Sequence, residues 1–177
     1  TLFPYTTLFR SLAGEVSSSL ALGDDDVFAL VQDVIRKIGY VDDNFGFNCN
    51  RFEFQNRLHQ QSGDINSAVE KGDERLGAGD QGMMFGYAVN ETEECMPLPI
   101  SLAHQLMERQ AEVRKSGKLP WLGPDAKCQV TVRYRVRGNP YAVDKVVLST
   151  QHGKDIASND IAEAGIEEII EPIVPMG

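Results

Sequence analysis

Apolar side chains recur at helical spacing in the first third of the chain. The spacing predicts a helix that opens at Gly23-Asp24 and is stopped by Gly39, with acidic residues at its positively polarised N-terminal end. One face of this helix carries the apolar residues Val27, Leu30, Val31, Val34, Ile35 and Ile38.

Two more helices are predicted by the same period. One runs over about 100–116 and ends at Gly117, with a face formed by Ile100, Ala103, Leu106, Met107, Gln110 and Val113. The other runs over about 158–171, and its inward residues are Ile161, Ile166, Ile169 and Ile170.

Alternating and continuous apolar runs predict the strands. The clearest alternation covers 127–137, where Cys128 and Val130 point to one side while polar residues point to the other. A Gly-Asn-Pro turn follows, so 141–151 is the predicted hairpin partner. Further strands are expected over 12–19, over 45–58 with a change of parity at a bulge, and, as a buried strand, over 83–90.

A polar, glycine-bearing segment over 60–79 separates the two halves of this pattern. A loop of this length inside a compact domain is usually functional, often as a lid. The order of elements is strand–helix–strand, then strand–helix–strand–strand–helix. It predicts an α+β fold of two related units, each a sheet with helices on one face.

Composition narrows the possible functions. The chain has 177 residues, enough for one domain or two small ones. Its 17 Lys and Arg face 26 Asp and Glu, and the net charge of −9 disfavours a nucleic-acid binder. No apolar run approaches a membrane span. The 3 cysteines form no CxxC, which argues against a disulfide framework or zinc site and favours a reducing cytoplasm.

The first eleven residues, TLFPYTTLFRS, do not fit the rest of the pattern. They lack the ordered features of a leader peptide. The string resembles the translation of a sequencing-adapter oligonucleotide, so residues 1–11 are expected to be a non-native leader. Such a leader should make few contacts and lie outside the core. The alternative is a native, disordered N-terminus.

Gly77–Gly82 reads GAGDQG and matches the GxGxxG dinucleotide fingerprint. The fingerprint needs a strand before it and a helix after it. Here a charged loop precedes and a strand-like run follows, so a dinucleotide fold is disfavoured. Asp80 between the glycines is either an exposed functional carboxylate or the cap of a turn.

Asp125 and Lys127 stand two residues apart at the start of the alternating strand. In an extended chain they point the same way, and together they could hold a sugar hydroxyl and a phosphate. The alternative is a solvated charge pair. The three histidines, His59, His104 and His152, lie far apart without an obvious partner or metal-ligand spacing.

Several sequence blocks carry a family resemblance. They are LAGEVSS (12–18), IGYVDDNFGF (38–47), GAGDQGMMFGYAVNET (77–92), RQAEVRKSGKLPWLGPDAK (109–127) and VVLSTQH (146–152). Together they resemble methionine adenosyltransferase, also called S-adenosylmethionine synthetase, and the GAGDQG and MFGYA blocks are the most specific to it. The resemblance covers Leu12 to Pro175.

This resemblance implies three similar α+β domains around a pseudo-threefold axis. Residues 12–76 would be the remainder of the first domain, with a gating loop over about 61–71. Residues 77–177 would be the central domain, cut short at its C-terminal end.

The family's reaction is attack by the methionine sulfur on the 5′ carbon of ATP, followed by cleavage of the released triphosphate. A neutral thioether needs no general base, so the demand is for in-line positioning and for stabilised charge on the leaving triphosphate. The resemblance implies Mg²⁺ and K⁺ as cofactors, with their main ligands outside this chain. It also implies a cytoplasmic homodimer or homotetramer with shared active sites.

Five residues receive roles from the resemblance. Lys127 would be the catalytic cation on the triphosphate, and Asp125 would contact the nucleotide. Methionine would be contacted by Glu15, Gln61 and Asp80. No metal ligand is expected within this chain.

The chain also departs from the family pattern. The family's N-terminal His-Pro-Asp-Lys stretch is absent, as are its later phosphate-binding basic residues and a second metal-binding Asp. We therefore expect a fragment of the transferase that is inactive alone. One alternative is a non-catalytic truncated relative that acts as a dimerisation or assembly module. The other is an unrelated acidic α+β domain, which the matching blocks disfavour.

Overall fold

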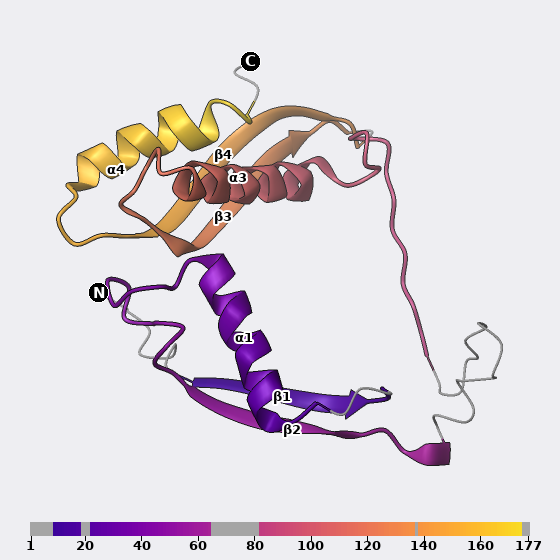
Figure 1. The fold of residues 1–177 in the computed structure, drawn as a ribbon. Coiled ribbons are helices and arrows are strands. Elements are labelled where there is room, and N and C mark those ends of the chain that lie inside the picture. Colours follow the sequence, from indigo (N-terminus) through magenta and orange to yellow (C-terminus); the bar gives the residue numbers. More distant parts are fainter. Residues whose placement is uncertain (1–8, 19–21, 65–81, 137, 175–177) are drawn as a thin grey trace. The chain divides into compact units, whose positions relative to one another are not determined.

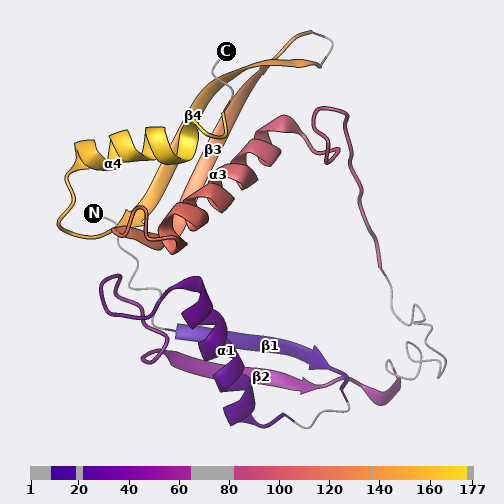
Figure 2. The ribbon, with the colours of Figure 1, turned by 45° about the horizontal axis from the view of Figure 1, so that its top comes forward.

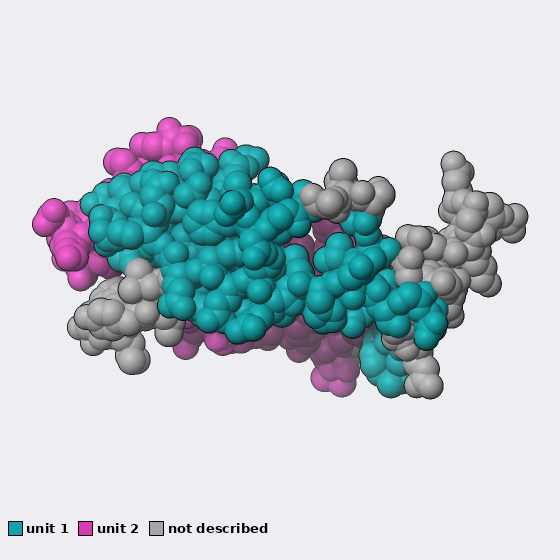
Figure 3. All heavy atoms as spheres, turned by 60° about the horizontal axis from the view of Figure 1, so that its bottom comes forward, with its two compact units in different colours: residues 1–85 teal, residues 86–177 magenta. Residues whose placement is uncertain are grey.

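The computed structural model describes residues 9–18, 22–64, 82–136 and 138–174. The chain divides into two compact units, residues 1–85 (unit 1) and residues 86–177 (unit 2), coloured separately in Figure 3. The elements of both units mix helices and strands, which confirms the α+β class. The domain boundaries expected from the sequence, 12–76 and 77–177, stay predictions.

Unit 1 is built on a parallel strand pair (Figure 1). β1 (Phe9–Val16) pairs with β2 (Glu53–Gln60) from Phe9 opposite Glu53 to Val16 opposite Gln60. Parallel neighbours need a long crossover, usually a helix. Here α1 (Asp24–Ile38) lies in that connection.

α1 confirms the helix predicted from the sequence. The Asp26 carboxylate accepts a hydrogen bond from the Gly23 N–H at 2.9 Å, and Gly39 ends the helix at φ +119°, a conformation that favours glycine. The predicted apolar face is only partly buried. Val27 and Ile35 are in the core, whereas Leu30, Val34 and Ile38 are exposed.

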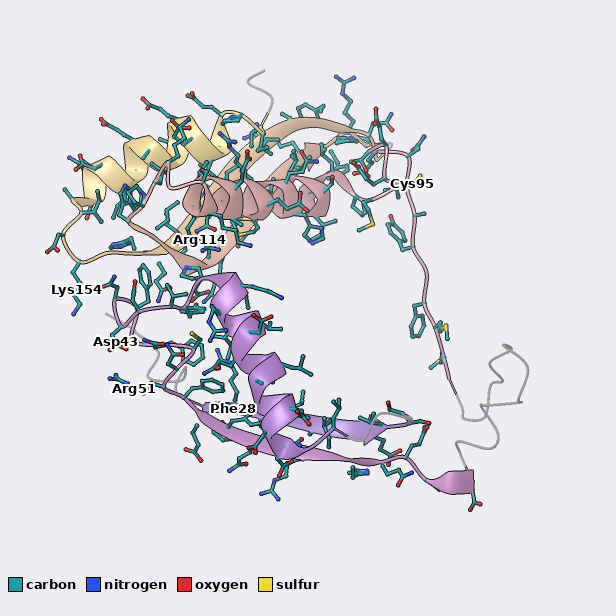
Figure 4. The ribbon with its side chains drawn as sticks, viewed as in Figure 1. Phe28, Asp43, Arg51, Cys95, Arg114 and Lys154 are labelled. Atoms are coloured by element: carbon teal, nitrogen blue, oxygen red, sulfur yellow. The ribbon has the colours of Figure 1, made fainter. Side chains whose placement is uncertain are left out.

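The strand expected over 45–58 is wrong for its first part, because strand structure begins only at Glu53. Before that, Asn48 and Asn50 turn the chain, with the Asn50 N–H donating to Asn48 Oδ1 at 2.9 Å. An ion pair between Asp43 and Arg51, at 3.4 Å, spans the same turn (Figure 4). The alternating apolar residues in this segment are therefore buried by a compact loop and not by a strand. The core cluster of unit 1 consists of Ile35, Phe47 and Cys49, against which Val31, Tyr40 and Phe52 pack.

The non-native leader expected at residues 1–11 takes part in this unit. Phe9, Arg10 and Ser11 pair with β2, and the Arg10 guanidinium lies 4.4 Å from the centre of the Phe47 ring. The expectation of few contacts is therefore wrong for these three residues. A parallel ladder is made by backbone groups, which any extended segment without proline supplies. Their side chains are exposed or half-buried, which agrees with a place outside the core. Residues 1–8 lie outside the described part.

Unit 2 is a β-hairpin with helices on one face (Figures 1 and 2). β3 (Leu122–Tyr134) and β4 (Pro140–His152) pair antiparallel, and Cys128 lies opposite Leu148. α3 (Leu98–Lys115) packs on β3, and the Cys128 thiol donates to Ala103 O at 3.2 Å. These positions confirm the predicted helix, hairpin and inward face. The core consists of Leu106, Val113, Leu119, Leu122, Ile169 and Val174.

The buried strand expected over 83–90 is wrong. Met83, Met84 and Phe85 are 81%, 95% and 89% exposed, and the segment forms no strand. A doubly buried strand needs neighbours on both edges and layers on both faces. The described residues form only two two-stranded sheets, and neither includes this segment.

The last helix is corrected in its second half. α4 (Ser158–Gly165) continues into a π-helical turn, η2 (Ile166–Ile170). A π-turn inserts extra backbone per turn and so rotates the following side chains relative to an α-helix. Ile169 is accordingly 1% exposed, whereas Ile166, expected inside, is 48% exposed. No helix in the described ranges is long and apolar enough to cross a membrane.

Replacing Ile169 by alanine should lower the free energy of unfolding by about 2–5 kcal/mol, because it leaves a cavity in the core. The matched change Ile166→Ala, in the same turn, should cost less than about 1 kcal/mol. Urea denaturation of both variants measures the difference. Equal losses would contradict the rotation that the π-turn introduces.

Candidate functional site

The candidate site in unit 2 lies at the start of β3, where the pairing of β3 with β4 is irregular. Leu122 lies opposite His152, but the next pair is Ala126 with Thr150. Residues 123–125 therefore face Gln151 alone, and β3 holds two more residues than β4 there. We call residues 123–125 the bulge. Bulges are common next to active sites, where they redirect side chains.

Asp125 is the last residue of the bulge, and Lys127 follows two residues later. Both residues are exposed on the outer face of β3, the face opposite the helices, as their spacing predicts. Lys127 pairs with Ser149 across the hairpin. Within the described ranges its ammonium makes no ion pair, unlike Arg133, which is bound by Asp144. An anion could therefore reach Lys127 without displacing a carboxylate of the described residues.

Glu15 and Gln61 come together at one end of the strand pair in unit 1. Glu15 lies opposite His59, and the Gln61 N–H donates to Val16 O at 3.1 Å, one residue past β2. Glu15 is the penultimate residue of β1 and Gln61 directly follows β2, so both lie at the carboxyl ends of neighbouring parallel strands. His59, for which the sequence showed no partner, has Nδ1 3.9 Å from Glu15 Oε1.

The remaining predicted residues lie outside the described part of the chain. Asp80 and most of the expected gating loop, 65–71, lie outside the described residues, as does most of the GAGDQG block. Glu15 and Gln61 belong to unit 1, whereas Asp125 and Lys127 belong to unit 2. Each pair is therefore described within its own unit.

The described residues do not fit a magnesium site of their own. Mg²⁺ takes oxygen ligands in near-octahedral geometry. In the described ranges, no group of three or more His, Cys, Asp or Glu residues could hold a metal ion. Asp125 at the bulge offers a single carboxylate.

One side chain of the site was missed by the sequence analysis of function. Gln110 of α3 is 2% exposed, and its amide donates to Gly123 O in the bulge at 3.0 Å. The sequence does single out Gln110, because it is the one amide in the otherwise apolar face predicted for this helix. The His59–Glu15 pair had no such signal, because the two residues are brought together only by strand pairing.

Unit 2 is thus a two-layer α+β domain whose open sheet face presents a carboxylate beside a bulge, together with an ammonium that forms no ion pair among the described residues. The sequence model of the S-adenosylmethionine synthetase central domain matches residues 75–177, more than half of the chain. The chain belongs to the S-adenosylmethionine synthetase family, which confirms the resemblance drawn from the sequence blocks. It is therefore related to transferases of S-adenosylmethionine biosynthesis.

The other end of β3 is tied to the start of α3 by Glu91. Its Oε2 accepts hydrogen bonds from the Leu98 N–H and from the Tyr134 hydroxyl, each at 2.8 Å. Partial burial, the Glu91 carboxylate and the neighbouring Tyr87 raise the pKa of Tyr134 from 10.0 to about 12. On the inner face, burial raises the pKa of the Cys128 thiol.

The raised pKa of Tyr134 predicts a loss of stability in alkali. The neutral phenol contributes its full stability below pH 10, and this contribution disappears as the pH rises through about 12. Tyr134→Phe should remove this component of the alkaline destabilisation, because it leaves no group to titrate there. Unfolding free energies measured across this range for both proteins test the expectation. Parallel curves would show that Glu91 does not hold the phenol.

Proposed function

We propose that this chain carries part of the active site that forms S-adenosylmethionine from ATP and L-methionine. The observation that carries the proposal is that Lys127 and Asp125 are exposed together on the open face of a domain from this family, with no ion pair to Lys127 from any described residue. In the reaction, the methionine sulfur forms a bond to the ATP 5′ carbon while the bond from that carbon to the triphosphate oxygen breaks. The triphosphate leaves with the electron pair and is then cleaved.

Lys127 is proposed as the catalytic cation. Charge grows on the triphosphate as it leaves, and an ammonium aimed at that position stabilises the transition state more than the ground state. Asp125, on the same face, is proposed to contact the nucleotide. Neither group is asked to move a proton, because the attacking sulfur carries none.

Methionine is proposed to bind at the Glu15 and Gln61 end of unit 1, together with Asp80. A carboxylate such as Glu15 suits the α-ammonium group of an amino acid, and an amide such as Gln61 can bond either of its charged ends. His59 lies close enough to Glu15 to compete for its carboxylate when the imidazole is protonated.

Further components are proposed from the family resemblance. Mg²⁺ and K⁺ would offset the repulsion between the triphosphate and a chain of net charge −9, through ligands outside this chain. A cytoplasmic homodimer or homotetramer would complete shared active sites. The competing proposal is a truncated relative that serves only in assembly.

Lys127→Met in the complete enzyme that contains this sequence should lower turnover by about 10²-fold or more, because one aimed positive charge on a leaving anion is lost. Lys145→Met is the matched control, since Lys145 is also exposed on β4 and makes no ion pair within the described ranges. That control should change turnover less than about twofold. A loss below about tenfold for Lys127→Met, with folding intact, would reduce Lys127 to a surface charge.

The chain as written should show no turnover with ATP, methionine, Mg²⁺ and K⁺. By the family resemblance, we expect residues other than those of this chain to supply the metal-binding carboxylates and most of the triphosphate-binding cations. Product formation is followed by chromatography of the purified chain. Turnover near the ~10 s⁻¹ of an ordinary enzyme would contradict the assignment of catalytic work to the absent residues. Self-association of the chain, with no turnover in the longer protein that contains it, would favour the assembly module.

A further inference from the structure

The bulge removes backbone groups from the β3–β4 ladder. Gly123, Pro124 and Asp125 face one residue of β4, so they cannot all pair with it. Pro124 has no N–H to donate. Backbone groups that leave a ladder need other partners when they are buried, and Gly123 is buried.

Gln110 supplies those partners from α3. Its Nε2 donates to Gly123 O at 3.0 Å and to Thr150 Oγ1 at 3.1 Å. Both hydrogens of one buried amide are therefore used, one on each strand. Thr150 pairs with Ala126, the residue between Asp125 and Lys127. The two contacts thus lie on either side of Asp125, and the second is one residue before Lys127.

Gln151 closes the bulge from the opposite strand. A Cβ at Gly123 would lie 2.5 Å from Gln151 Oε1 and 2.8 Å from Gln151 Cβ, so the Gln151 side chain occupies the space that only glycine leaves. The same Oε1 is 3.5 Å from the Asp125 N. The bulge is therefore held on one side by Gln110 and covered on the other by Gln151.

We propose that Gln110 is a positioning residue, which fixes the bulge and thereby the direction in which Asp125 and Lys127 leave β3. The role of Gln110 in fixing the bulge follows from the contacts above. The effect of Gln110 on anion binding rests on the proposed function of Lys127. A long flexible side chain such as that of lysine binds a phosphate well only when its backbone is already in place. Gln110 supplies that preorganisation without touching substrate.

The test compares three variants of the full chain. Gln110→Met keeps the volume but removes both donors. Gln110→Glu keeps the shape but places a carboxylate against the Gly123 carbonyl, where it can donate only when protonated. The matched control is Gln105→Glu, which makes the same charge change on α3 in a side chain that bonds Ser101 Oγ instead.

The first measurement is independent of any ligand. Backbone amide NMR shifts of Asp125, Ala126 and Lys127 should move in Gln110→Met and Gln110→Glu but stay at their native values in Gln105→Glu. Lowering the pH should move the shifts in Gln110→Glu part of the way back, because the protonated carboxyl supplies one of the two lost donors, and should not move them back in Gln110→Met. Native shifts in Gln110→Met, with only a lower unfolding midpoint, would overturn the proposal.

The second measurement uses inorganic tripolyphosphate as the probe. Gln110→Met should weaken its binding about tenfold, the size of one lost aligned contact, and should add little once Lys127→Met is present. Equal binding by the native chain and Lys127→Met would overturn the proposed function, while moved amide shifts would still support the role of Gln110 in the bulge. Additive losses from the two changes would overturn the link between Gln110 and Lys127.

If Gln110→Met does not fold, Gly123→Ala supplies the second variant. It leaves the core amide in place and forces Gln151 away from the bulge. It should move the same amide shifts and weaken tripolyphosphate binding in the same direction. Unchanged shifts in a folded Gly123→Ala chain would contradict the proposal that this bulge geometry sets the site.

Discussion

The burial of one face of the β3–β4 hairpin is the constraint on which unit 2 depends. Two strands alone are at best marginally stable in water, so they need a covering layer. Here Val130, Val146 and Leu148 turn toward the helices, and Leu106 of α3 is completely buried among them. Once that face is committed to the core, the opposite face is left for solvent and ligands. Lys127 lies on that open face because Cys128, its neighbour, lies on the covered one.

The number of extra residues in the bulge follows from the same constraint. Because side chains alternate along a strand, one extra residue would move either Leu122 out of the core or Lys127 into it. Two extra residues let Leu122 and Cys128 both face the helices. β3 can therefore have an irregular backbone at Asp125 while Leu122 and Cys128 keep their contacts with the core. The hydrogen bonds lost from the ladder are replaced by side chains, above all that of Gln110.

Elements whose burial follows their own period could be predicted from the sequence. α3 and the hairpin are of this kind, and so is the shared face of Asp125 and Lys127. α1 was predicted from its spacing and its ends, although only part of its apolar face is buried. The failures have a different origin. Phe47 is buried by a turn and Ile166 is turned outward by a π-helix, so neither follows the period of a regular element.

Contacts in the site between residues far apart in the sequence could not be predicted from the hydrophobic pattern either. The approach of Glu15 to Gln61 depends on parallel pairing between two strands separated by a helix, and alternation within one strand does not specify its partner. The contact of Gln110 with Gly123 depends on how α3 sits on β3. Only the presence of an amide in an apolar face could have indicated that a buried partner exists.

The acidic composition gives local ion pairing a decisive role in where an anion can bind. Arg109 and Lys118 are drawn to Glu168, and Arg133 is held by Asp144, so these cations are already partly neutralised. In the described part of unit 2, Lys127 makes no such pair. An acidic chain repels a triphosphate at long range, but screening limits that repulsion to about 8 Å at physiological salt. Within that distance, an ammonium without an ion pair among the described residues, such as that of Lys127, attracts the anion most strongly. The bulge, by fixing the backbone of β3, sets the position of that ammonium.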